Sequence, residues 1–230
     1  MKRTVELGKW RVGLFSQEPL LAALGATDRN TLLGMGSRRT YQAGDRIMTQ
    51  GATEDFVLAL SSGWTTVSAD SDNGRSVIFG LCGPHDLVGE LAIFDGGPRS
   101  ANVTALTNVS AQLLTRSQFQ SFLRKHPHAY EAVLRGMAIR LRAADIHSQD
   151  LATLPVLRRL ARLLLDVDGK DPRAAAAARL TQNELAAAIG ATRESVAKAL
   201  ADLRSRDVLR TLDRRIVVID RPALAAIAAL

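Results

Sequence analysis

The chain has 230 residues, 47% of them hydrophobic, and a formal net charge of +7. Such a chain can bury one large core or two modest ones, and no apolar run approaches the roughly 18 residues of a membrane span. Its single cysteine, Cys82, excludes an internal disulfide and cannot by itself hold zinc or an iron–sulfur cluster. The first residues carry charge but no apolar signal core. We therefore expect a cytoplasmic protein with no membrane partner.

The positive charge lies mainly in the C-terminal third. Residues 151–230 contain 14 Lys and Arg against 9 Asp and Glu, which leaves a net charge of only +2 for residues 1–150. A basic segment of this kind favours a polyanionic partner, although many basic proteins bind no polyanion.

The first half of the chain changes from helical to strand-like texture. Residues 14–36 have helical spacing and are broken by Pro19 and Gly25 into short helices. From about residue 41 to 115, short alternating or β-rich segments separated by turn formers predict a small barrel or jelly roll. The predicted strands are Val57–Leu60, Trp64–Ala69, Ser76–Leu81, Ala101–Leu106 and Ser110–Leu114.

A single long helix is predicted over Ala129–Thr153, which lacks proline and is rich in Ala, Leu and Arg. Apolar and small residues recur along it in steps of three and four, as in a coiled-coil seam. The alternative is that the helix packs on its own barrel, and one helix can do both. Pro155 either ends this helix or kinks it, and it marks a hinge before a second helix, Val156–Val167. The seam consists of Leu134, Met137, Leu141, Ala144, Ser148 and Leu151.

A helix-turn-helix follows in the basic third. Thr181 and Glu184 form a capping box that starts one helix, Gly190 supplies a tight turn, and Thr192 caps a second helix. The inner faces of the two helices are apolar: Leu185, Ala186, Ile189, Val196, Ala199, Leu200 and Leu203.

The outer face of the second helix has the chemistry of a DNA reader. Arg193 can donate two hydrogen bonds to guanine, Glu194 can accept from cytosine N4, and Lys198 can donate to guanine. Short hydroxyl side chains on the same face can bond phosphates. The alternative is that this outer face of the helix is only a charged surface in contact with solvent. Two β-rich segments after this helix, 208–212 and 215–219, predict a wing. The expected DNA-binding residues are Gln182, Thr192, Arg193, Glu194, Ser195, Lys198 and Arg214 at the wing tip.

A second motif lies inside the predicted barrel. Residues 89–101 read GELAIFDGGPRSA, which places Glu90 and Arg99 around a glycine-rich turn. Backbone N–H groups, an Arg fork and a carboxylate suit a phosphate joined to a ribose. The alternative is a salt bridge between Glu90 and Arg99 over a hairpin.

This motif resembles the phosphate-binding cassette of cyclic-nucleotide-binding domains. With the ATRESVAK sequence of the helix-turn-helix behind it, the chain resembles the CRP/FNR (catabolite activator) family over nearly its whole length. The resemblance implies an α+β fold with a cyclic-nucleotide-binding β-barrel (1–127), a long dimerisation helix (128–154) and a winged helix-turn-helix (155–230). It also implies a homodimer that binds a pseudo-palindromic double-stranded DNA operator, with RNA polymerase as a further partner.

The resemblance also implies roles for single residues. Arg99 is expected to bind the cyclic phosphate and Glu90 the ribose hydroxyl, with backbone or hydroxyl contacts from neighbouring residues of the cassette. On the long helix, Ala144 and Asp145 stand where the family has a Thr-Ser pair that touches adenine, so the expected effector is cAMP or cGMP. The alternative is that Asp145 is an exposed helix residue. Lys198 replaces a family Arg and loses the bidentate fork. The expected nucleotide-binding residues are Gly89, Glu90, Leu91, Arg99, Ser100, Ala101, Ala144 and Asp145.

Three readings of the chain differ in function. The first is a transcription regulator gated by cAMP or cGMP. The second keeps the DNA binding but makes the barrel a constitutive or protein-responsive module that binds no nucleotide, or one that takes a cyclic dinucleotide. The third is an enzyme, for which the sequence offers no nucleophile–base pair, paired catalytic carboxylates or metal cluster. The four histidines are too scattered for a metal site, and we expect neither a metal nor catalysis.

Overall fold

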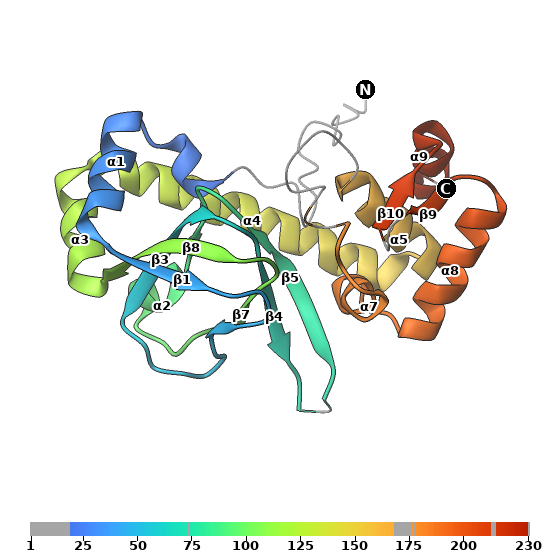
Figure 1. Cartoon of the computed structure of the whole chain (residues 1–230), viewed down its shortest axis with the longest axis horizontal. Coiled ribbons are helices and arrows are strands. Elements are labelled where there is room, and N and C mark those ends of the chain that lie inside the picture. The colour runs from blue at the N-terminus through green and yellow to red at the C-terminus, as the bar shows by residue number, and fades with distance from the viewer. Residues whose placement is uncertain (1–18, 73, 168–175, 177, 213–214, 230) are drawn as a thin grey trace, which may run out of the picture.

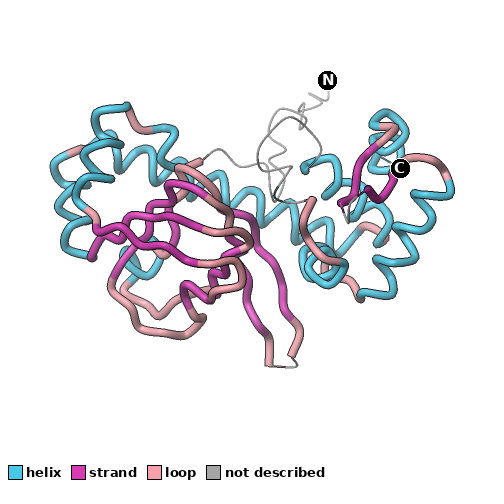
Figure 2. Tube along the Cα trace, in the orientation of Figure 1, coloured by secondary structure: helices cyan, strands magenta, loops and turns pink. Residues whose placement is uncertain are grey.

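The computed structural model describes residues 19–72, 74–167, 176, 178–212 and 215–229. Two four-stranded antiparallel sheets face each other in the first half of the chain, with strand orders β1-β8-β3-β6 and β2-β7-β4-β5 (Figures 1 and 2). Their inner faces enclose an apolar core that includes Leu58, Leu60 and Val103. The strands are β1 Ser37–Tyr41, β2 Arg46–Met48, β3 Phe56–Ser62, β4 Thr65–Asp70, β5 Ser76–Cys82, β6 Leu87–Val88, β7 Asn102–Ala105 and β8 Val109–Thr115.

Helices close one end of this barrel. A 3₁₀ turn, η2 (Leu20–Ala23), and α1 (Ala26–Met35) precede the strands, α2 (Glu90–Asp95) lies within them, and α3 (Arg116–Lys125) follows. Thr115 caps α3 with a complete capping box. Phe119, Phe122 and Leu123 of α3 are buried in a second apolar cluster beneath the barrel.

The long helix α4 (Pro127–Thr153) runs from the barrel to the C-terminal domain (Figure 1). Near its start, Ala129, Ala132 and Val133 are buried against the barrel, and Met137 packs on the same cluster. Leu134 and Leu141 face away from the barrel, with 61% and 64% of their surfaces exposed. The helix therefore packs on its own barrel along one side and carries an apolar stripe on another.

The C-terminal domain is a winged helix-turn-helix. It contains α5 (Val156–Val167), α7 (Gln182–Ile189), α8 (Arg193–Ser205), the wing strands β9 (Leu209–Leu212) and β10 (Arg215–Val218), and α9 (Arg221–Ala229). Its core includes Leu160, Leu185, Val196 and Leu203. Leu154, between α4 and α5, has extended backbone, so the chain turns directly before Pro155.

Strand β5 of the barrel packs against the C-terminal domain. Ile78 and Leu81 are buried in the same apolar cluster as the core of the helix-turn-helix, and β5 packs against α7. The C-terminal domain thus rests on the barrel as well as on the end of α4.

The fold class expected from the sequence is confirmed, and all five expected strands are present with their ends shifted by one or two residues. Three strands, β1, β2 and β6, were not expected. The glycine-rich segment after Gly89 holds a short helix, α2, where the sequence favoured a turn or hairpin. The expected short helices of residues 14–36 are η2 and α1, apart from residues 14–18, which lie outside the described chain.

Candidate nucleotide and DNA sites

Two glycines shape the cassette at the ends of α2. Gly89 precedes the helix with a φ of 85°, and Gly96 follows it with a φ of 71°, both in the left-handed region that favours glycine. A Cβ at Gly89 would also lie 2.6 Å from Nη1 of Arg99. Glycine at 89 is therefore required twice, once for the backbone conformation and once for the approach of the guanidinium.

Arg99 is a buried cation with a fixed orientation. Its side chain donates from Nε to Glu54 Oε2 (3.2 Å), from Nη1 to the Gly89 carbonyl (2.7 Å) and from Nη2 to the Phe56 carbonyl (2.7 Å). The Phe56 ring lies 4.8 Å from its Cζ. Arginine has five N–H donors, so one N–H remains on each terminal nitrogen. This pair suits a bidentate bond to a phosphate.

Glu90 is buried beside it and pairs with the long helix. Its Oε1 accepts a hydrogen bond from Nη1 of Arg140 at 2.6 Å, and only 3% of the Glu90 side chain is exposed. Burial is the largest single influence and lowers the pKa of Arg140, but the charge and hydrogen bond of Glu90, together with Cys82 and Asp86, raise it above the ordinary value. Glu90 and Arg99 thus take different partners, Arg140 and Glu54, instead of the direct salt bridge that was the alternative to a ligand site.

A cavity of about 70 Å³ lies between these two groups. It is smaller than the roughly 300–1,000 Å³ of typical ligand pockets. Six of the expected nucleotide-binding residues line it: Gly89, Glu90, Leu91, Arg99, Ser100 and Ala101. Ala144 and Asp145 are exposed one turn further along α4, and Arg140 is the residue of α4 that reaches the cavity.

The second site is the start of α8. The Thr192 hydroxyl accepts a hydrogen bond from the backbone N–H of Ser195 at 3.2 Å and caps the helix. Arg193, Glu194 and Lys198 are exposed, while Val196 on the opposite face is buried. The backbone N–H of Glu194 itself and then the Thr192 hydroxyl hold the pKa of the Glu194 carboxyl below its ordinary value, so this group is a charged acceptor at neutral pH.

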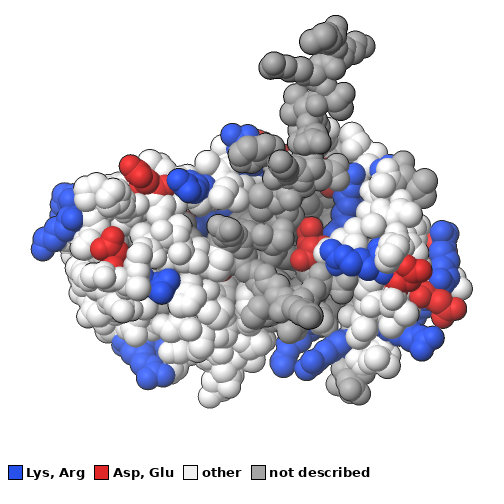
Figure 3. All heavy atoms as spheres, turned by 90° about the horizontal axis from the view of Figure 1, so that it is seen from above, with Lys and Arg blue, Asp and Glu red and all other residues white. Residues whose placement is uncertain are grey.

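Gln182 lies half-buried in the first turn of α7, and the expected capping box of Thr181 and Glu184 is present with both of its hydrogen bonds. Arg214, the expected wing-tip contact, lies outside the described residues. In the view of Figure 3, the Lys and Arg side chains of the C-terminal domain alternate with acidic side chains instead of forming one patch.

Within the described ranges, no three His, Cys, Asp or Glu side chains gather in the way a metal ion needs. In that same part of the chain, no helix combines the length and the apolar character of a membrane span.

Comparison with known proteins decides the family. Residues 38–126 match the model of the cyclic nucleotide-binding domain, and residues 158–227 match the Crp-like helix-turn-helix domain. The chain is 33% identical over 190 residues to a CRP-like cAMP-activated global transcriptional regulator of Mycobacterium tuberculosis, covering 80% of this chain and 85% of that protein. The chain belongs to the CRP/FNR family. It is a transcription regulator with a cyclic-nucleotide-binding domain and a DNA-binding helix-turn-helix.

Two further relatives span a similar range. A cyclic AMP receptor protein of Thermus thermophilus is 28% identical over 194 residues, covering 84% of this chain and 88% of that protein. The solved structure of the c-di-GMP responsive regulator CLP of Xanthomonas campestris has a TM-score of 0.75 at 22% identity, covering 84% of this chain and 99% of that one. The latter likeness concerns the fold of this CRP/FNR regulator.

Two residues of the cassette site were not expected from the sequence. Glu54 lies 45 positions before Arg99, and Arg140 lies 50 positions after Glu90. Neither stands in a motif. A buried Arg and a buried Glu each require a partner of opposite charge, and this requirement was the one signal that a search for Glu54 and Arg140 could have used.

Proposed function

We propose that this CRP/FNR regulator is a homodimer whose DNA binding is controlled by a cyclic nucleotide. The favoured effector is cAMP, and cGMP is the alternative. The observation that carries the proposal is Arg99. The residue is 3% exposed, and its guanidinium is fixed by three acceptors. Two N–H donors remain without an acceptor among the described residues, in a cavity that Glu90 and Ser100 also line. The names of the Mycobacterium and Thermus relatives support cAMP.

The Glu90–Arg140 pair gives such a ligand a route to the long helix. A ribose hydroxyl that donates to Glu90 bonds the same carboxylate that Arg140 holds. A cavity of about 70 Å³ also has to widen before a nucleotide enters. Both changes act on α4, the helix that leads to the DNA-binding domain. Ligand binding is therefore coupled to the position of that domain through a contact that differs between the two states.

The exposed stripe of α4 is the proposed dimer interface. Leu134 and Leu141 are one heptad apart and exposed, which suits a seam against a second copy of the helix. In such a dimer two copies of α8 read two half-sites of a pseudo-palindromic operator. Ala144 and Asp145 then remain proposed contacts for the base. The regulator would act in the cytoplasm together with RNA polymerase, as the described role of its relatives in transcription suggests.

The small volume of the cavity and the ion pair that Glu90 already forms with Arg140 favour one second candidate function. In it the barrel binds no nucleotide and serves only for dimerisation. The two candidates differ in one measurement, ligand binding by the purified protein.

Isothermal titration and thermal shift with cAMP, cGMP and cyclic di-GMP test the proposal. Ligand at 100 times its dissociation constant stabilises the native state by about 2.7 kcal/mol. The Arg99→Leu variant should lose this shift, whereas Arg124→Leu, at an exposed arginine of α3, should keep it. Binding of none of the three nucleotides by the wild type would establish the second candidate.

A further inference from the structure

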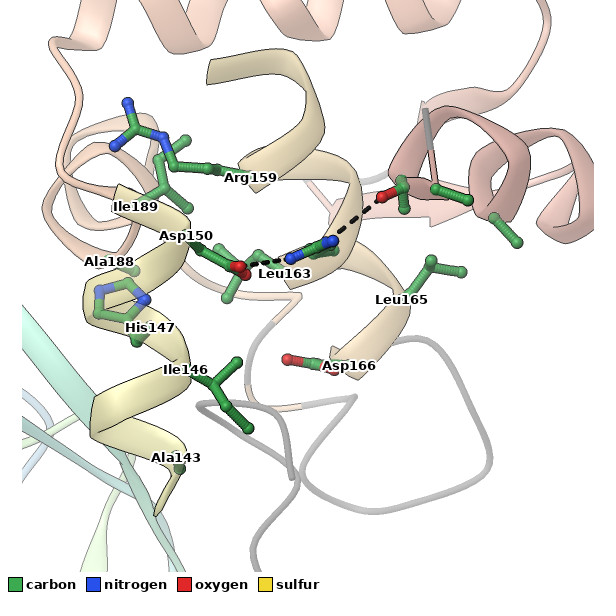
Figure 4. Close-up of a pocket in the computed structure, with 14 residues that line it drawn as sticks. Ala143, Ile146, His147, Asp150, Arg159, Leu163, Leu165, Asp166, Ala188 and Ile189 are labelled. Carbon is green, nitrogen blue, oxygen red and sulfur yellow. Dashed lines mark hydrogen bonds and ion pairs between the residues drawn. The ribbon is translucent and has the colours of Figure 1, made fainter. Parts of the chain in front are cut away.

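A larger cavity lies at the bend between α4 and α5. It has a volume of about 270 Å³, close to the lower end of the roughly 300–1,000 Å³ of ligand pockets. Figure 4 shows the end of α4 on one side and α5 crossing the other. Most of the lining is apolar and comes from four helices, with Ile146 on α4, Leu163 on α5, Ile189 on α7 and Ala228 on α9.

The cavity is on a different face of α4 from the proposed dimer seam. His147 and Asp150 of α4 line it, whereas Leu141 and Ser148 are exposed. At 100° per residue, His147 and Ser148 point in directions about 100° apart. A second copy of α4 packed on the seam therefore leaves this cavity open.

Two polar atoms in the lining are buried without a partner. Among the residues that the structure describes, neither Nε2 of His147 nor Nε of Arg159 has a hydrogen-bond partner. Buried polar atoms in native proteins are paired in the large majority of cases. The two groups are also close enough to interact electrostatically, because the Arg159 charge contributes to a lowered pKa of His147.

The other main charges of the lining already have partners. Arg162 forms an ion pair with Asp150 across the bend and also donates from Nε to the Ala228 carbonyl at 3.3 Å. Asp166 likewise has an interaction of its own. Arg159 makes only a long hydrogen bond, 3.5 Å from Nη1 to the Leu151 carbonyl. Arg159 is thus the cation of this cavity that lacks a carboxylate partner within the described chain.

We propose that this cavity is a second ligand site, for a small organic carboxylate with an apolar body. Arg159 Nε can only donate, and His147 Nε2 donates in one tautomer and in the protonated form. A carboxylate only accepts, and it therefore complements the Arg159 guanidinium, which has only donors. The Ala, Leu and Ile side chains of the remaining lining suit an aliphatic or aryl body and offer little to the polar edge of a nucleobase.

A ligand here contacts the elements that set the position of the DNA-reading helix. A Cβ at Gly190, in the turn between α7 and α8, would lie 2.6 Å from Leu151 Cδ2 and 3.7 Å from Arg159 Nη1. The Arg159 side chain therefore lies beside that turn. A carboxylate bound to it connects α4 and α5 with the helix-turn-helix and stabilises the arrangement of the two domains seen here.

Calorimetric titration of the full chain with octanoate tests the site, with octanamide as a neutral ligand of the same shape. We expect octanoate to bind in the millimolar range or tighter and octanamide at least about tenfold more weakly, since hydrogen bonds to charged groups are the strong ones. Arg159→Gln should weaken octanoate about tenfold or more, whereas Arg158→Gln, at the neighbouring arginine outside the lining, should leave it unchanged. Lack of octanoate binding by the wild type, or equal affinity for the amide, would overturn the proposal.

Two additions keep the result independent of folding defects and of the cyclic-nucleotide proposal. Ala225 is exposed and lines the cavity, so Ala225→Leu should fill it and weaken octanoate, whereas Ala226→Leu, exposed and outside the lining, should not. The Arg99→Leu variant should bind octanoate like the wild type, whatever it does with cAMP. If Ala225→Leu binds octanoate as tightly as Ala226→Leu, or if Arg99→Leu loses octanoate binding, the ligand is elsewhere and the proposal is wrong.

Discussion

Gly89 and Gly96 flank the same short helix with the same backbone conformation but different surroundings. A Cβ at Gly96 meets nothing within 4 Å, whereas one at Gly89 meets the Arg99 guanidinium. We expect Gly96→Ala to cost about 1–2 kcal/mol of unfolding free energy, the price of a left-handed L-residue, and to leave ligand binding intact. Gly89→Ala should cost at least as much and also weaken cyclic-nucleotide binding. Urea unfolding and titration of both variants check this, and equal ligand affinities would contradict the role given to Gly89.

His147 should make the stability of the protein depend on pH. Burial, and secondarily the Arg159 charge, lower the pKa of His147, although Asp150 opposes them. The unfolded chain, with a His pKa near ~6.5, then binds the proton more readily than the folded one, so stability is full above that value and falls as the pH drops through it. The urea concentration at the unfolding midpoint should fall when the pH is lowered from about 7.5 to about 5.5. This fall should be smaller in His147→Gln than in the wild type. His128→Gln, at an exposed position of the same helix, should show the wild-type loss.

Arg193 should determine sequence preference at one base pair. It is exposed in the first turn of α8, where recognition helices contact base edges. We expect Arg193→Ala to cost about 1–3 kcal/mol of DNA-binding free energy and to relax specificity at one position. Arg204→Ala, in the last turn of the same helix, should leave the preference unchanged. Selection of sites from a randomised DNA library measures both, and an unaltered preference in Arg193→Ala would contradict the assignment.

At the scale of elements, the sequence predicts the helices and strands that neighbouring residues mark. It misses those that depend on contacts between distant residues. The capping box of Thr181 and Glu184 is complete within four residues, so the start of α7 followed directly. Strand β1 consists of SRRTY and is almost wholly exposed, so no apolar alternation marks it. Helix α2 has six residues, too few for a helical period to show against its two glycines.

The candidate nucleotide site likewise contains residues that a local motif marks and residues that only the folded chain brings there. Gly89, Glu90 and Arg99 lie within eleven consecutive residues and form a recognisable motif. Glu54 and Arg140 come close to this motif only in the folded chain. Glu54 contacts it from the barrel and Arg140 from α4. Their contribution depends on tertiary contacts that no local pattern encodes.

The apolar stripe on α4 should hold two copies together. Leu141 is exposed in the single chain, and burying a Leu side chain is worth about 1.5–3 kcal/mol. Because a symmetric dimer buries two, Leu141→Gln should weaken association by about 100-fold or more. Arg135→Gln, at an exposed position about 100° around the helix from Leu134, should not. Sedimentation velocity across a dilution series distinguishes them, and a monomeric wild type would end the dimer proposal.

At the scale of the whole molecule, the two domains share one apolar cluster, to which β5 contributes Ile78 and Leu81. The helix-turn-helix is held by the barrel and by the end of α4, while Glu90 and Arg140 join the barrel to the middle of that helix. A ligand bound at Glu90 therefore acts on a connected structure.

The most direct test is DNA affinity measured with and without cAMP on a site selected by the protein itself. We expect saturating cAMP to tighten binding at least fivefold in the wild type, the lower end of typical allosteric couplings of about 5–150-fold, and to have no effect in Arg99→Leu. Tight, specific binding by nucleotide-free protein that cAMP and cGMP leave unchanged would contradict the account.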